Sequence, residues 1–174
     1  MSLVITRPHP SEYPPYFDSY ISLIKGDDII KTLNEGIPSF QMLISLVTEH
    51  KENFRYAPGK WTLKEVIGHM TDVERIMSYR ALSFARGERM ALPGFDENDY
   101  VKNANFSKRA LADLAYEFTQ LRTANVNLFR SFDQTVLDRK GIANGKEINV
   151  RAILFVIAGH QIHHTNIIQT RYLV

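Results

Sequence analysis

The chain has 174 residues, no cysteine and a formal net charge of +2 at pH 7. This length suits one domain with a hydrophobic core, and the missing cysteines exclude disulfides, thiolate zinc sites and a cysteine nucleophile. A small net charge without a basic run argues against a nucleic-acid partner. No apolar stretch approaches the roughly 20 residues that span a bilayer, and no signal peptide is recognisable. We therefore expect a cytoplasmic protein without a membrane partner.

The first 26 residues are rich in proline and aromatic residues, above all between Arg7 and Phe17. Dense prolines remove backbone donors and prevent a long helix, whereas so many aromatic rings are unusual in a disordered tail. Residues 1–26 are therefore predicted to form an extended arm that lies across the domain or across a partner subunit. Residues 27–174 form the predicted domain.

The domain begins with an amphipathic helix from about Asp27 to Val47. Asp27 and Asp28 supply an N-terminal cap and favourable negative charge in the first turn. Apolar residues then recur at alternating steps of three and four, which is the period of a helix with one buried face.

A second helix is predicted from the sequence Thr62-Leu63-Lys64-Glu65, which has the spacing of a capping box, to about Arg86. Its apolar stripe carries two polar residues, His69 and Arg80. An arginine on a buried stripe requires a partner, and we expect either an acidic residue or a ligand. Glu65, one turn before His69, is interpreted first as the capping residue and second as a catalytic base.

A long connection, residues 87–106, separates the second and third helices. Its length allows it to cross a bundle from end to end, so that the two helices run parallel. The third helix is predicted from Ser107, as the N-cap, to about Phe132. Asn125 interrupts its apolar stripe and is expected to make a buried structural hydrogen bond.

The dipeptide Asn144-Gly145 predicts a tight hairpin before the fourth helix. That helix is predicted from Asn149, as the N-cap, to about Tyr172. His160 and His164 are four residues apart and lie in the middle of its buried face, one turn from each other. His163 lies at the edge of that face, where it could contact a substrate.

Three histidines, His69, His160 and His164, thus lie on the inward faces of two helices. Buried imidazoles need a partner for each ring nitrogen, and a metal ion provides one partner for all three rings. Three imidazoles with an open position are typical of a catalytic metal site, and they suit Zn, Ni, Cu or Fe. The alternative is a polar core network that fixes the register of the helices.

The chain also resembles the DinB_2 branch of the DinB-like (DinB/YfiT) superfamily. The resemblance lies in four stretches and in their order and spacing, namely Tyr56–His69, Asp72–Arg75, Val150–Ala152 and Ala158–His164. It covers nearly the whole domain.

This resemblance implies an all-α four-helix bundle with up-down-down-up topology. It also implies a divalent metal ion, for which we expect Zn or Ni, held by His69, His160 and His164. Relatives are commonly homodimers, and they include bacillithiol S-transferases, mycothiol-dependent isomerases and proteins described as metal-dependent hydrolases. The family name refers to damage induction and implies no DNA binding.

Three functions are consistent with these features. In the first, the metal holds a low-molecular-weight, bacillithiol-like thiol as thiolate for transfer to a small electrophile, with Arg80 or His163 contacting the substrate. In the second, a hydrolase activates a water molecule at the metal and needs a base such as Glu65, Asp72 or Glu74. In the third, the protein is a non-catalytic, stress-related metal-binding module, although structural zinc sites normally have four protein ligands.

Overall fold

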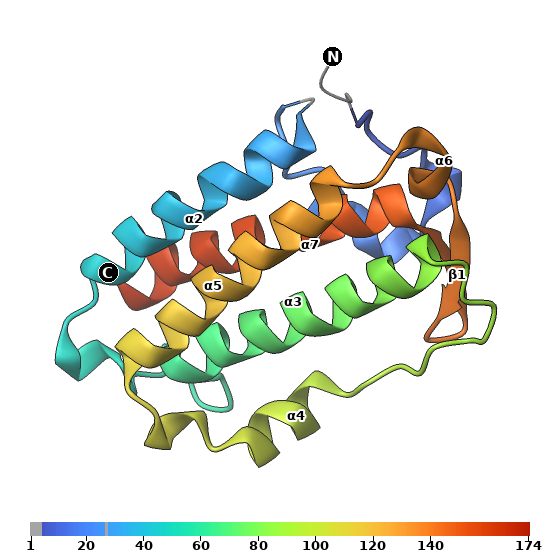
Figure 1. Ribbon diagram of the computed structural model, residues 1–174. Coiled ribbons are helices and arrows are strands. Elements are labelled where there is room, and N and C mark those ends of the chain that lie inside the picture. The colour runs from blue at the N-terminus through green and yellow to red at the C-terminus, as the bar shows by residue number, and fades with distance from the viewer. Residues whose placement is uncertain (1–4, 27) are drawn as a thin grey trace.

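Four long helices form a bundle in the computed structural model, which describes residues 5–26 and 28–174 (Figure 1). They are α2 (Ile29–Ser45), α3 (Leu63–Ala85), α5 (Leu111–Arg130) and α7 (Val150–Ile167). Helices α2 and α7 run in one direction, and α3 and α5 run in the other, so that the topology is up-down-down-up (Figure 1). This arrangement confirms the predicted fold class. No helix within the described residues is both long and apolar enough to cross a membrane.

Side-chain caps fix where three of these helices begin. Asp28 accepts a hydrogen bond from the backbone of Lys31, and Asn149 accepts one from the backbone of Ala152. Thr62 and Glu65 form the reciprocal bonds of the predicted capping box at the start of α3. The other proposed capping residue of the first helix, Asp27, lies outside the described residues.

The connection between α3 and α5 contains a helix that was not predicted, α4 (Glu97–Ala104), followed by the short turn η4 (Phe106–Lys108). Asp96 caps α4 by accepting hydrogen bonds from two backbone amides. The prediction that Ser107 caps the third helix is wrong, because Ser107 lies in η4 and α5 begins only at Leu111. Phe106 in this turn is buried and packs closely against Gly68 of α3.

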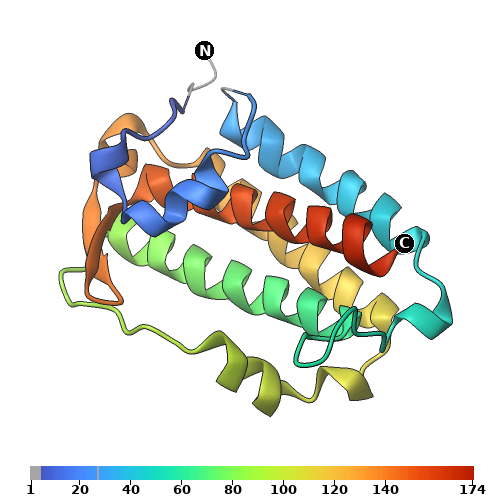
Figure 2. The same cartoon turned by 180° about the vertical axis from the view of Figure 1, so that it is seen from behind.

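The N-terminal arm folds into three short pieces, η1 (Pro10–Glu12), η2 (Pro15–Phe17) and α1 (Asp18–Ile21). It buries apolar side chains in the main core, namely Ile5, Tyr13, Ile21 and Ile24. Arg7 donates hydrogen bonds to the carbonyl groups of Ile21 and Ile24. Helix α1 packs against α7 on the face seen in Figure 2.

A two-stranded hairpin follows the short helix α6 (Gln134–Leu137) and leads into α7. Strands β1 (Lys140–Ala143) and β2 (Lys146–Asn149) pair antiparallel, and Gly141 lies opposite Ile148. Asn144 and Gly145 have φ values of 52° and 70°, which is the backbone of a two-residue hairpin turn with a positive φ at both positions. The predicted hairpin is confirmed.

A buried polar network, built around one ion pair, ties the four long helices of the bundle together. Arg122 of α5 donates to both carboxylate oxygens of Glu74 on α3, over 2.8 and 2.7 Å. Asn125 donates to the same carboxylate over 3.0 Å, which confirms its predicted structural role. Arg122 also donates to the side chain of Gln161 on α7, whose amide donates to the carbonyl of Gly36 in α2. The polar network therefore reaches all four helices.

Removing one member of this ion pair is expected to destabilise the fold strongly, because the remaining charge stays buried without its partner. We expect Glu74→Leu to lower the free energy of unfolding by about 3 kcal/mol or more. The double variant Glu74→Leu/Arg122→Met is expected to be more stable than the sum of the two single changes predicts. Urea denaturation of the four proteins measures this coupling.

The exposed ion pair between Lys140 and Glu147 provides the control. Its side chains are 49% and 61% exposed, so that Glu147→Leu should change the free energy of unfolding by less than about 1 kcal/mol. Equal effects of Glu74→Leu and Glu147→Leu would show that the buried pair does not hold the helices together.

Candidate metal centre

His69 lies close to the N-terminal end of helix α3, where the capping box fixes the first turn. The residue before it, Gly68, allows a close approach from the crossover, because a Cβ at Gly68 would lie 2.4 Å from the Phe106 ring. His69 is buried, and its ring centroid lies 4.7 Å from that of Trp61. The ring is therefore held between α3 and the loop that precedes it.

Helix α7 supplies the other two histidines, His160 and His164, on the face that packs against α3. As at His69, a glycine precedes the first of them. Gly159 allows α1 to approach closely, because a Cβ at this position would lie 2.2 Å from the carbonyl oxygen of Tyr20 in α1. The Tyr20 ring meets His160 edge-on, with the centroids 5.4 Å apart. The N-terminal arm thus forms one wall around the histidines.

The three imidazoles point their Nε2 atoms at one another. Nε2 of His160 lies 3.1 Å from Nε2 of His69 and 3.1 Å from Nε2 of His164. Each of the three residues offers a ligand atom within 4.8 Å of the others. In a tetrahedral site with zinc–nitrogen bonds of 2.0–2.1 Å, two ligand nitrogens are about 3.3 Å apart. The observed spacing therefore fits a single divalent ion that the three nitrogens share.

Hydrogen bonds alone do not satisfy this arrangement. Nε2 of a neutral imidazole carries either one proton or one lone pair, so Nε2 of His160 can form one good hydrogen bond, and it has two close nitrogen neighbours. Nδ1 of His164 is also buried without a hydrogen-bond partner among the described residues. A neutral ring that carries its proton on Nδ1 presents a free lone pair at Nε2, and three such lone pairs are a donor set for a cation.

Burial keeps all three imidazoles uncharged. It lowers the pKa of His69 to about 4 and that of His164 to about 3, with a smaller contribution from neighbouring histidines. The pKa of His160 lies well below its ordinary value, mainly because the ring is buried and to a smaller extent because His164 lies beside it. Neutral imidazole is the form that binds metal, so that at neutral pH the three rings are in the state that a metal site requires.

A cavity of about 230 Å³ reaches His164 from the surface. Its lining includes Tyr56, Trp61, Asn98 of α4 and Tyr172. Tyr172 belongs to η5 (Ile168–Tyr172), the last turn of the chain, and its hydroxyl donates to the carbonyl of Trp61 over 2.6 Å. This bond holds the Tyr56–Trp61 loop in place as one wall of the cavity.

The other proposed site residues do not join the histidine cluster. Glu65 caps α3 and pairs with Arg55, so that its carboxylate is occupied. His163 is half-buried and packs edge-on against Tyr20, outside the set of converging nitrogens. Arg80 lies 11 residues after His69 on α3, and at a rise of 1.5 Å per residue the two are about 16 Å apart along the helix axis.

The two further acidic candidates also lie away from the cavity that reaches His164. Glu74 is buried in its ion pair with Arg122. Asp72 is half-buried, and burial raises the pKa of its carboxyl group against the opposing effect of Arg75. None of the described residues that line the cavity is acidic.

Comparison with known proteins places these features in a family. The sequence model of the DinB superfamily matches residues 33–168. Among solved structures, the chain is similar to YfiT from Bacillus subtilis, described as a probable metal-dependent hydrolase with an unusual four-helix bundle topology. The two share 18% sequence identity with a TM-score of 0.76, over 84% of this chain and 86% of that one. No curated protein matches the chain.

The lowered histidine pKa values predict how the metal-free protein responds to acid. The unfolded chain binds protons near pH 6.5, whereas the folded protein leaves these rings neutral down to about pH 4, so stability falls as the pH drops from 7 to 5. His69 should account for about 2 kcal/mol of that fall. Urea denaturation of chelator-treated wild type and His69→Gln at both pH values measures it.

Half-exposed His163 is the matched control, because His163→Gln should leave most of the pH dependence in place. If His69→Gln lost as much stability between pH 7 and pH 5 as the wild type, the ring would not be buried in its neutral form.

Proposed function

This chain belongs to the DinB superfamily, and from its converging histidines we propose that it is a metal-dependent enzyme whose ion, Zn or Ni, is held by His69, His160 and His164. The observation that carries the proposal is the pair of 3.1 Å contacts between Nε2 atoms in a buried site that a cavity reaches. Three protein ligands leave a coordination position for a substrate, whereas structural zinc sites usually have four protein ligands.

We propose transfer of a low-molecular-weight, bacillithiol-like thiol to a small electrophile as the reaction. A divalent ion in this site supplies positive charge that lowers the pKa of a neighbouring thiol or water molecule. The cavity contributes apolar ring surface from Trp61 and Tyr56 for the electrophile, and Lys60 contributes a positive charge for an anionic cosubstrate. Thiol transfer needs no carboxylate base, which agrees with a cavity lined without acidic residues.

Metal-dependent hydrolysis is the second candidate, and the similarity to YfiT favours it. A hydrolase of this kind would use a protein base to take a proton from water. The three carboxylates that could serve are accounted for elsewhere, since Glu65 caps a helix, Glu74 pairs with Arg122, and Asp72 does not line the cavity. For this reason we place thiol transfer first.

Parallel activity assays distinguish the two reactions. Protein reconstituted with Zn or Ni is incubated with bacillithiol and chlorodinitrobenzene, and separately with nitrophenyl acetate in the absence of thiol. We expect metal-dependent conjugation of the thiol, reduced at least about a hundredfold in His160→Ala, because the ion would stabilise the thiolate by several kcal/mol. Ester hydrolysis without thiol conjugation would replace the first proposal with the second.

Asn98 tests whether the substrate occupies the cavity at His164. Asn98→Ala should raise KM for the electrophile severalfold, because Asn98 lines this cavity. Asn103, an exposed asparagine of the same helix that does not line the cavity, is the matched control, and Asn103→Ala should leave KM unchanged. Equal kinetics in both variants would place the substrate elsewhere.

A further inference from the structure

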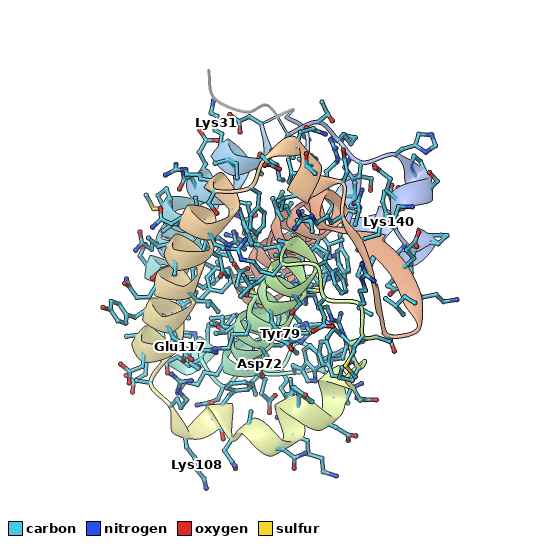
Figure 3. All side chains as sticks on the ribbon, turned by 45° about the vertical axis from the view of Figure 1, so that its right-hand side comes forward. Lys31, Asp72, Tyr79, Lys108, Glu117 and Lys140 are labelled. Carbon is cyan, nitrogen blue, oxygen red and sulfur yellow. The ribbon has the colours of Figure 1, made fainter. Side chains whose placement is uncertain are left out.

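A second cavity, the Arg80 groove, lies between α3 and the crossover segment that leads into α4. It has a volume of about 310 Å³, and its lining includes Arg75, Tyr79, Arg80, Pro93, Phe95 and Tyr100. Figure 3 shows Tyr79 and Asp72 along α3, above the crossover, with Glu117 on neighbouring α5. The groove shares no lining residue with the cavity that reaches His164.

Arg80 is a buried cation without a carboxylate partner among the described residues. The residue is only 6% exposed, and its guanidinium group forms none of the salt bridges in residues 5–26 and 28–174. One guanidinium nitrogen donates to the carbonyl of Pro93 over 2.8 Å, and another lies 3.4 Å from the sulfur of Met77. The carbonyl of Pro93 is thus the one strong acceptor that the described residues supply to its five N–H donors, and the others are open to solvent or to a ligand in the groove.

A buried charge of this kind is costly unless an anion or several hydrogen bonds compensate it. The two further buried arginines among the described residues, Arg122 and Arg151, each have a carboxylate partner, Glu74 and Asp138 respectively. Arg75, which also lines the groove, is paired with Glu117. None of the described residues that line the groove is acidic, so that Arg80 gives the groove an uncompensated positive charge.

Aromatic side chains provide the rest of the recognition surface. The Phe95 ring lies 5.9 Å from the guanidinium carbon of Arg80 and 5.1 Å from the Tyr100 ring, measured between centroids. Tyr79 and Tyr100 line the groove but are 58% and 47% exposed, which is unusual for large rings that serve only to pack a core. The volume is at the small end of the range for ligand pockets.

We propose that the Arg80 groove binds a small aromatic carboxylate. The carboxylate pairs with the free N–H groups of Arg80, and the ring packs among Tyr79, Phe95 and Tyr100. This site is distinct from the metal centre and does not depend on the proposed reaction. Helix α4 contributes to both cavities, with Asn98 in one and Tyr100 in the other.

Nuclear magnetic resonance titration with phenylacetate, and with neutral phenylacetamide as its isostere, tests the proposal on the full chain. Phenylacetate should shift the backbone amides of Tyr79, Gly94 and Tyr100, and phenylacetamide should bind at least about tenfold more weakly. Arg80→Met should weaken phenylacetate binding by a similar factor, because a hydrogen bond to a charged group is lost.

Three further variants make the result independent of folding defects and of the metal. Tyr79→Ala removes an exposed wall of the groove and should weaken binding severalfold, whereas Tyr116→Ala, at an exposed tyrosine outside the groove, should not. His160→Ala should leave phenylacetate binding unchanged. No saturable binding, equal binding of the amide, full binding by Arg80→Met or Tyr79→Ala, or loss of binding in His160→Ala would each overturn the proposal.

Discussion

Three uncharged imidazoles lie close together between α3 and α7, and the packing of the surrounding helices has to hold them there. Nε2 of His160 has two nitrogen neighbours at 3.1 Å and can form one good hydrogen bond, so this buried arrangement is stable only if the helices are held firmly or a cation lies among the nitrogens. The Glu74–Arg122–Gln161 network provides the first condition, because it links α3, α5 and α7. The divalent ion that we propose provides the second.

Two glycines bring the surroundings close to the histidines. Gly68 and Gly159 each precede a histidine of the cluster, and each leaves room for a neighbouring segment that a Cβ would displace. At Gly68 the neighbour is Phe106 of the crossover, and at Gly159 it is the backbone of Tyr20 in the arm. The crossover and the N-terminal arm therefore both pack beside the site, and the cavity at His164 is the described route to it.

Local sequence signals predicted the parts of this fold that depend on local chemistry. The capping residues Asp28, Thr62 and Asn149 and the Asn144-Gly145 turn behave as predicted, because their hydrogen bonds and φ angles are set within a few residues. The spacing of His160 and His164 likewise predicts their common face. Resemblance to the family supplied the up-down-down-up order and strengthened the assignment of His69 as the third member of the cluster.

The features that the sequence did not predict depend on contacts between distant segments. Helix α4 is short and polar, so it lacks a strong periodic signal, and Ser107 fails as a cap because Phe106 is fixed against Gly68. The full burial of Arg122 could not be inferred from its neighbours, since its partner Glu74 is 48 residues away in the chain. The sequence did predict that Arg80 is buried, but it could not show that its acceptor within the chain is the carbonyl of Pro93 in the crossover rather than a carboxylate.

Metal content tests the central claim most directly. Protein purified without an affinity tag should contain about one equivalent of Zn or Ni per chain, as wild type and as His163→Ala, whereas His160→Ala should contain almost none. His163 is the sharpest control, because it is a histidine of the same helix whose ring lies beside the cluster without joining it. Equal metal content in His160→Ala and His163→Ala, or no metal in the wild type after reconstitution, would contradict a three-histidine metal centre.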